Sequence, residues 1–263
     1  MFPPAKTEEQ YRQDILDIGK LVFDKGWVAA NDGNISIRLD DDRILCTCTN
    51  VCKGLMKAED LIICDANGKK LEGSRGTTSE IAMHLTIYRM RHDIRSVVHA
   101  HPPVATGFAA AGRALNLALL PEVVIGLGIV PLADYGLPGT PALTEGMLQY
   151  IPNYDAILMA NHGCVSYGAD AHQAYFRMET VEHFARITLV AELLGGPKVL
   201  PRVEVQKLFD SRARYGVNSR AKMEPGAPLV AEDIEPAGER LRITREELIA
   251  IIDEALRNRG VLA

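Results

Sequence analysis

The chain has 263 residues, of which 47% are hydrophobic and 24% charged, and its formal net charge is −5 at pH 7. This composition suits a globular protein with one large core, and the negative balance argues against a nucleic-acid partner, because phosphate-backbone binding needs a basic patch. No apolar run approaches the ~20 residues that span a bilayer, and MFPPAKTEEQ carries no apolar signal segment, so we expect a cytoplasmic chain without a membrane partner.

An amphipathic helix is predicted from Thr7 to about residue 25, because a capping box precedes apolar residues at helical spacing. Two hairpins are predicted next: GNISIRLDDDRILCTCT alternates around an Asp-rich turn, and DLIICDANGKKLEG contains Asn67-Gly68, a strong two-residue turn signal. Cys46, Cys48 and Cys52 fit no common zinc spacing. With five cysteines in total we expect reduced thiols, and a second metal site from those three is the less favoured alternative.

The middle of the chain alternates helical and strand patterns. TTSEIAMHLTIYRMRHD has helical period, and a short apolar strand then carries His99 and His101 before a double proline that suits the start of another helix. YDAILMANHGCVSYG predicts a strand, a tight turn and a strand, followed by a long helix capped by Asp170 and ending near Leu194. Strands flanked by helices predict a mixed α/β domain, with one sheet covered on both faces.

The composition changes after about residue 218. KMEPGAPLVAEDIEPAGERL has prolines and glycines among charges, which is typical of a linker. A capping box at Thr244 then opens a short helix with Leu248 and Ile252 along one face. We therefore expect a domain over residues 1–218 and a linker with an amphipathic helix over residues 219–263.

Three histidines are candidate metal ligands. In SVVHAHPPVATG, His99 and His101 lie one residue apart and project to the same side of a strand. MANHGCV offers His162 as a third nitrogen, where Gly163 permits a tight turn. A catalytic zinc site typically takes three protein ligands and keeps an open position. The alternative for the pair is that one of His99 and His101 is a hydrogen-bonded core residue and the other a surface residue. The alternative for His162 is a hydrogen-bonded histidine of the turn.

Glu80 is a fourth candidate, because GTTSE leads into a predicted helix. A carboxylate there can simply compensate the helix dipole. The N–H groups and hydroxyls at a helix start also form a phosphate cradle, and the turns NDGNIS and TCTN offer similar cradles. Ordinary turns are the alternative for these segments.

The ordered segments GNISIR, TCTNVCKGLMKAEDL, TTSEIAMHLTIYR, VVHAHP, DYGLPGT and ANHG resemble the zinc-dependent class II aldolase/adducin-head family, most closely its L-fuculose-phosphate aldolase branch, from about Ile15 to Gly216. The resemblance implies a three-layer α/β/α domain with a central, mainly antiparallel sheet, and a homotetramer with active sites between subunits. It implies one Zn²⁺ per subunit, held by Glu80, His99, His101 and His162. It also implies substrate phosphate binding by Gly33, Asn34, Thr49, Asn50, Thr78 and Ser79.

The implied reaction is reversible aldol cleavage of a ketose 1-phosphate of the fuculose, rhamnulose or deoxyribulose type, as in fucose or rhamnose degradation, giving dihydroxyacetone phosphate and a small aldehyde such as lactaldehyde. Glu80 would be a zinc ligand in the resting state and the base when substrate arrives. Zinc would polarise the carbonyl as a Lewis acid. Tyr215, in RYG, falls on a functional tyrosine of the family and would be an acid or a stacking contact.

The chain departs from the family pattern at three points. Asn50 replaces a glycine of the phosphate loop, which keeps a left-handed turn accessible but adds bulk. Thr78-Ser79 replaces a serine pair and keeps both hydroxyls. A tyrosine that the family supplies from a neighbouring subunit has no counterpart before Pro131, where the sequence has Leu120 or Glu122, so the proton donor stays open.

Three other functions stay open on the same scaffold: a decarboxylase of an oxo-acid phosphate, a pentulose-phosphate 4-epimerase, and a metal-free adducin-like binding module. Glu80 disfavours the epimerase, in which the motif carboxylate is usually aspartate. The tail resembles the encapsulation peptides of enzymes packaged in bacterial microcompartments, where a shell confines a reactive aldehyde. The alternative is a helix that packs on a neighbouring subunit.

Overall fold

The computed structural model describes residues 6–217, 220 and 228–234. Two compact units divide the chain, Met1–Ala231 and Glu232–Ala263, and nearly all described residues belong to the first. Within the described ranges, none of the helices has the length and hydropathy of a bilayer span. Most of the predicted linker and the whole helix expected after Thr244 lie outside the described residues, so the division at 218/219 stays a prediction. Leu229 nevertheless belongs to the first unit, where its N–H donates to the carbonyl of Asn116.

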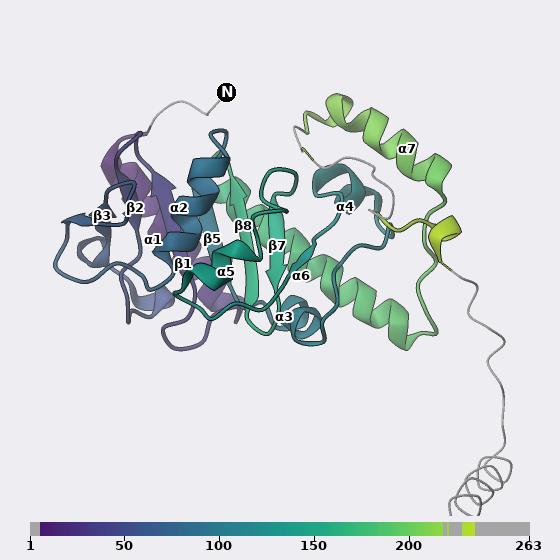
Figure 1. Ribbon diagram of the computed structural model, residues 1–263, viewed down its shortest axis with the longest axis horizontal. Helices are drawn as coiled ribbons and strands as arrows, with labels where there is room; N and C mark the ends of the chain where they lie inside the picture. The colour runs from purple at the N-terminus through teal and green to yellow at the C-terminus, as the bar shows by residue number, and fades with distance from the viewer. Residues whose placement is uncertain (1–5, 218–219, 221–227, 235–263) are drawn as a thin grey trace, which may run out of the picture. The chain divides into compact units, whose positions relative to one another are not determined.

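The elements follow one another in the mixed order that the sequence pattern predicts (Figure 1). The helices are α1 Glu8–Asp24, α2 Ile81–Met90, α3 Pro103–Ala110, α4 Pro121–Gly126, α5 Pro141–Glu145, α6 Ala171–Leu193 and α7 Arg202–Ser211. The strands are β1 Asn34–Arg38, β2 Ile44–Cys46, β3 Ile62–Cys64, β4 Lys70–Glu72, β5 Ser96–Ala100, β6 Leu132–Ala133, β7 Ala156–Met159 and β8 Gly163–Gly168. Short 3₁₀ turns are η1 Lys53–Leu55, η2 Ala58–Asp60, η3 Arg212–Tyr215 and η4 Ala231–Asp233.

The strands form one eight-stranded sheet in the order β4-β3-β2-β1-β5-β8-β7-β6. Only the edge pair β6–β7 is parallel, and every other neighbouring pair is antiparallel. This confirms a mainly antiparallel sheet. In its centre, β5 pairs with β1 on one side, with Asn34 opposite His99, and with β8 on the other, with Val165 opposite His99.

Both faces of the sheet are covered, as expected for a three-layer domain. Alternate strand residues such as Ile35, Ile37 and Val98 join α1, α3 and α6 in one apolar core. Strand residues that point to the other face of the sheet, such as Val97 and Val165, join α2 and α5 in a second apolar core. Figure 1 shows α2 and α5 on one side of the sheet and α1 and α6 on the other.

Local sequence explains most element boundaries. The Thr7 hydroxyl accepts from the N–H of Gln10, whose side chain accepts from the N–H of Thr7, which confirms the capping box of α1. The carboxylate of Asp170 caps α6 by accepting from the N–H of Gln173. The β3–β4 turn differs from the expected two-residue turn at Asn67-Gly68: the N–H of Gly68 donates to the carbonyl of Asp65, and Gly68 alone takes a positive φ, +85°. The turn therefore lies one residue earlier, with Gly68 as the left-handed residue after it.

Candidate metal centre

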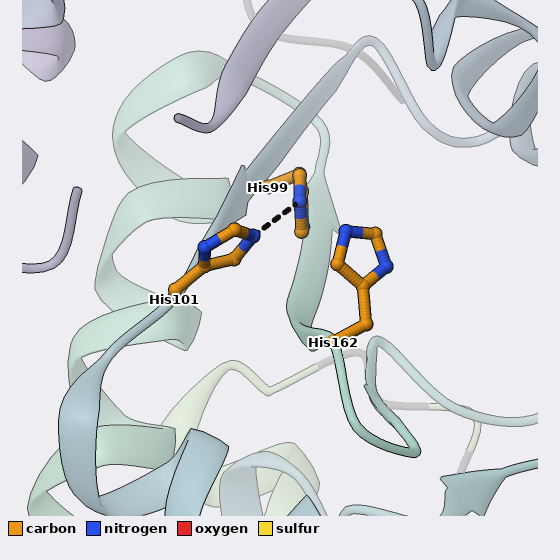
Figure 2. Close-up of side chains that lie close together, drawn as sticks. All are labelled: His99, His101 and His162. Atoms are coloured by element: carbon orange, nitrogen blue, oxygen red, sulfur yellow. Dashed lines mark hydrogen bonds between the residues drawn. The ribbon is translucent and has the colours of Figure 1, made fainter. Parts of the chain in front are cut away.

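The three predicted histidines meet at one end of the central strands. His99 lies within β5, His101 one residue beyond its end, and His162 in the turn between β7 and β8. Each side chain offers a nitrogen within 4.8 Å of the other two, and Figure 2 shows the rings gathered around a common space. β5 and β8 are hydrogen-bonded neighbours, so a short antiparallel ladder brings His162 into one cluster with two histidines that lie 61 and 63 positions earlier in the chain.

The chain at the start of β8 passes so close to His101 that only glycine fits at position 163, the first residue of this strand. A Cβ on Gly163 would lie 2.5 Å from Cδ2 of His101 and 2.8 Å from the carbonyl oxygen of Ala100. The sequence suggested that Gly163 permits a tight turn, but its φ is not positive, so the backbone conformation does not require glycine. Glycine is needed at position 163 because a side chain would collide with the imidazole of His101.

Glu80 completes the cluster from the second core. It is the N-cap residue of α2, and its carboxylate caps no backbone N–H there. Instead Oε2 lies 3.2 Å from Nε2 of His99, and Oε1 lies 3.1 Å from Nε2 of His162. The side chain is thus directed into the histidine cluster and away from the helix start, so dipole compensation does not explain its position.

The cluster is buried, which sets its protonation. Burial lowers the pKa of His99 to about 3, although Glu80 opposes the shift, and burial also lowers the pKa of His101. Burial alone would raise the pKa of Glu80, but the neighbouring imidazoles of His99 and His162 and the amide of Asn34 lower it below the usual range. The centre therefore combines an ionised carboxylate with the neutral imidazoles of His99 and His101 at pH 7.

These side chains fit a divalent metal ion. Nδ1 of His99 donates to the carbonyl of Cys164, so its neutral Nε2 carries a lone pair, yet that atom lies 3.2 Å from both Oε2 of Glu80 and Nε2 of His101. Oε1 of Glu80 is buried, and although Nε2 of His162 lies 3.1 Å away, none of the described residues forms a hydrogen bond to it. Lone pairs repel at this spacing, whereas a tetrahedral ion with bonds of about 2.0 Å sets its ligands about 3.3 Å apart.

A cavity of about 280 Å³ opens beside this centre. Its lining includes Glu80, His101 and His162, and it contains every residue expected to bind phosphate: Gly33, Asn34, Thr49, Asn50, Thr78 and Ser79. Three turns supply these residues, one before β1, one after β2 and one before α2. The structure thus brings the expected metal ligands and phosphate residues to one cavity, where their roles stay predictions.

Backbone conformation explains two residues of these turns. Gly33 has a φ of +73°, and a Cβ there would lie 2.8 Å from the carbonyl oxygen of His99. Asn50 takes a φ of +56°, the left-handed conformation that asparagine tolerates where the family has glycine.

Tyr215 does not join this group within the described part of the chain. It lies in η3, its side chain is 61% exposed, and it is not among the residues that line the cavity. Its functional role stays a prediction.

Two residues that the sequence patterns did not single out, Asp32 and Lys53, support the site. Oδ2 of Asp32 lies 3.5 Å from Nδ1 of His101, the arrangement in which a carboxylate orients a metal-binding imidazole. The buried ammonium of Lys53 donates to the carbonyls of Asn31 and Val51 and so joins two of the turns that form the cavity. The role of Asp32 could have been suspected from the sequence, because it adjoins Gly33 in a candidate phosphate turn. Nothing in the sequence distinguishes Lys53 from a surface lysine.

The fold and this centre together define a class of protein: a mixed α/β enzyme whose histidines and carboxylate could hold a divalent metal ion. Residues 13–189 match the family model described as Class II Aldolase and Adducin N-terminal domain. The chain belongs to this family, and it is a lyase of the class II aldolase type.

Individual relatives agree with this assignment. The chain is 34% identical over 177 residues to an L-fuculose phosphate aldolase of Methanococcus maripaludis, covering 67% of this chain and 95% of the relative. It is 31% identical over 197 residues to a 3-oxo-tetronate 4-phosphate decarboxylase of Pectobacterium atrosepticum, covering 73% and 88%. A solved structure of an L-fuculose 1-phosphate aldolase superposes with a TM-score of 0.73 at 27% identity, covering 80% of this chain and 99% of that one.

Proposed function

We propose that the protein is a zinc-dependent aldolase that reversibly cleaves a ketose 1-phosphate of the fuculose, rhamnulose or deoxyribulose type into dihydroxyacetone phosphate and a small aldehyde such as lactaldehyde. The observation that carries this proposal is the convergence of Glu80, His99, His101 and His162 beside a cavity lined by three backbone turns. Zinc fits because three imidazoles and one carboxylate are ligands that it prefers.

The proposed roles of the residues follow from their positions in the site. His99, His101 and His162 would hold the ion, which when bound supplies Lewis-acid polarisation of the substrate carbonyl, worth several kcal/mol in the transition state. In the synthetic direction the Glu80 carboxylate removes the proton beside that carbonyl, and in the cleavage direction it returns this proton. The turns that carry Gly33, Asn50 and Ser79 would receive the phosphate through N–H groups and hydroxyls.

A substrate panel tests the proposal. Purified protein with Zn²⁺ is incubated with the 1-phosphates of fuculose, rhamnulose, ribulose and 5-deoxyribulose, and released dihydroxyacetone phosphate is measured. We expect release from at least one, and release from none would refute the aldolase.

A second candidate is a decarboxylase of an oxo-acid phosphate, which the 31% identity to the 3-oxo-tetronate 4-phosphate decarboxylase supports. This reaction needs the same centre but no aldehyde pocket. Carbon dioxide release from 3-oxo-tetronate 4-phosphate, without triose phosphate release from the ketose panel, would favour it. A metal analysis that finds no stoichiometric Zn²⁺ would instead favour a metal-free, adducin-like module.

We also propose a homotetramer as the working assembly. Apolar side chains are exposed along α6, including Phe176, Val190 and Leu193, which supports a contact with another copy of the chain. Light scattering after gel filtration gives the mass in solution, and a monomer at micromolar concentration would contradict the assembly.

For the tail, we propose that residues 237–263 direct the enzyme into a bacterial microcompartment, so that the aldehyde product is confined. A linker composition followed by an amphipathic pattern supports this proposal. Packing of the same segment on a neighbouring subunit is the alternative.

A further inference from the structure

A chain of buried hydrogen bonds extends from Glu80 into the second core, away from the cavity. Nδ2 of Asn34 lies 2.8 Å from Oε2 of Glu80, and Oδ1 of Asn34 lies 2.6 Å from Nε2 of His84. Nδ1 of His84 lies 2.6 Å from the hydroxyl of Ser36, which lies 2.7 Å from the hydroxyl of Tyr88. All five residues are buried, and His84 and Ser36 are fully so.

One helix and one strand build this chain by simple spacing. Glu80, His84 and Tyr88 lie four residues apart, so they share one face of α2 and its N-cap. Asn34 and Ser36 lie two residues apart on β1 and share the sheet face turned toward α2. A polar stripe of the helix therefore meets a polar stripe of the strand inside an otherwise apolar core.

The amide of Asn34 fixes the direction of every bond in the chain. Its Nδ2 can only donate, so it donates to Glu80, and its Oδ1 can only accept. Nε2 of His84 must then donate, and because burial lowers the pKa of His84 to about 4, its neutral Nδ1 must accept from Ser36. The Ser36 oxygen in turn accepts from Tyr88. Each group has one orientation that satisfies its neighbours, and reversing one would leave buried groups unpaired.

This chain holds a geometry and does not carry protons, because the Asn34 amide can neither give up nor take a proton at neutral pH. We propose that His84, supported by Ser36 and Tyr88, is a positioning residue that fixes the Asn34 amide and through it the Glu80 carboxylate. The carboxylate is thereby held with one oxygen toward His99 and the other toward His162. Asn34 thus acquires a role beyond the phosphate contact implied by the family resemblance, since its side chain is already engaged by His84 and Glu80.

The test removes one donor and then restores it. His84→Leu deletes both ring nitrogens, whereas His84→Gln places an amide N–H where Nε2 lies and keeps the bond to Asn34. Thr86→Val is the matched control: it lies on the same helix and loses a buried hydrogen bond to the carbonyl of Ala82, but does not touch Asn34. Co²⁺ affinity is measured by titration of its visible absorption, together with kcat, KM and thermal unfolding of the metal-free proteins.

We expect His84→Leu to weaken Co²⁺ binding by about 10- to 100-fold, the usual effect of losing a residue that orients a metal ligand. Its kcat should fall by a similar factor with little change in KM. His84→Gln should recover most of both losses, and Thr86→Val should bind and turn over like the wild type. Wild-type Co²⁺ affinity and spectrum in His84→Leu, or no recovery in His84→Gln, would overturn the proposal.

A milder variant covers the case in which His84→Leu does not fold. Ser36→Ala removes one hydroxyl and frees His84 to reverse its ring, so we expect about fivefold weaker Co²⁺ binding, and unchanged binding would overturn the proposal. The turnover measurement rests on the proposed function, but the Co²⁺ titration does not. A wild-type protein that binds Co²⁺ and cleaves no ketose 1-phosphate would refute the aldolase and leave the positioning role of His84 intact.

Discussion

At the scale of single residues, the proposed mechanism makes two demands on Glu80. As a ligand it would have to be ionised, and as a base it would have to accept a proton when substrate displaces it from the ion. The structure meets the first demand with the amide of Asn34 and the imidazoles of His99 and His162 around the carboxylate. Once an ion is bound, those imidazoles are engaged by it, which leaves the carboxylate as the group free to exchange a proton.

Glu80→Gln tests this division of roles. Three imidazoles remain, so we expect the variant to retain Zn²⁺ while kcat falls about 10²- to 10⁴-fold, the usual contribution of a general base. Metal content by mass spectrometry and triose phosphate release are measured together. Glu59→Gln makes the same chemical change at a side chain that is 78% exposed and should have no effect. Normal turnover by Glu80→Gln would remove Glu80 from the mechanism.

His84 should also make the stability of the metal-free protein depend on pH. Its pKa is about 4 in the folded chain and about 6.5 when unfolded, so between these values the unfolded state binds more protons. The contribution is complete above pH 6.5 and is lost as pH falls toward 4. At pH 5 the loss is about 2 kcal/mol in the free energy of unfolding.

Urea unfolding at pH 7 and pH 5 measures this loss against His84→Gln, which does not titrate. The stability difference between wild type and variant should shrink by about 2 kcal/mol at pH 5. A difference that is the same at both pH values would show that His84 has the same pKa in the folded and unfolded chain.

At the scale of elements, the β7–β8 turn shows how local packing determines the site. Gly163→Ala would place a methyl group 2.5 Å from the His101 ring and 2.8 Å from the Ala100 carbonyl, and the backbone oxygen cannot move easily. We therefore expect His101 to be displaced and Co²⁺ affinity to fall at least about tenfold. Gly107→Ala, on an exposed position of α3 with open space around the added atom, should leave affinity unchanged. Wild-type affinity in Gly163→Ala would show that the turn tolerates a side chain.

Several elements were predictable because their signals are local. Capping boxes, prolines at helix starts and alternating strands gave α1, α3, α6 and the two hairpins, and the family resemblance implied the mainly antiparallel sheet. The β3–β4 turn was misplaced by one residue, because an Asn-Gly pair also suits a turn whose glycine follows the two central residues. The Asp65 carboxylate, which accepts from the N–H groups of Asn67 and Lys69, favours the observed form.

The polar chain behind Glu80 was not predicted, although its spacing is visible in the sequence. In the second core, α2 buries Leu85 and Tyr88, and the partly buried Ile81 packs against this core. Glu80, His84 and Tyr88 form a second stripe on the same helix, but polar residues at helical spacing usually face water. Only the pairing of β1 with β5 and the packing of α2 on that face show that this stripe is buried. Burial of polar groups depends on tertiary partners that a single sequence does not contain.

At the scale of the whole molecule, a net charge of −5 gives no general attraction for a phosphorylated substrate. Attraction must come from the cavity itself, whose lining includes the hydroxyl-bearing residues Thr49, Thr78 and Ser79. Under the proposed function, this cavity provides an anion site in a molecule of negative net charge. The proposed catalytic residues and metal ligands all lie in the unit that ends at Ala231, and the segment proposed for packaging follows that unit in the sequence.

Truncation tests whether the tail serves location or catalysis. A chain ending at Pro236 keeps Leu229 and Val230, which belong to the first unit, and loses only the segment proposed for packaging. We expect unchanged kcat, KM and thermal unfolding, because no residue that lines the cavity is removed. In a host that makes microcompartment shells, a fluorescent reporter fused to residues 237–263 should gather with the shells. The same fusion with Leu248→Glu and Ile252→Glu should spread through the cell, since charges on the apolar stripe would prevent docking. Uniform spread of the unaltered fusion would refute packaging, and a truncated enzyme that loses assembly mass would instead favour packing of the tail on a neighbouring subunit.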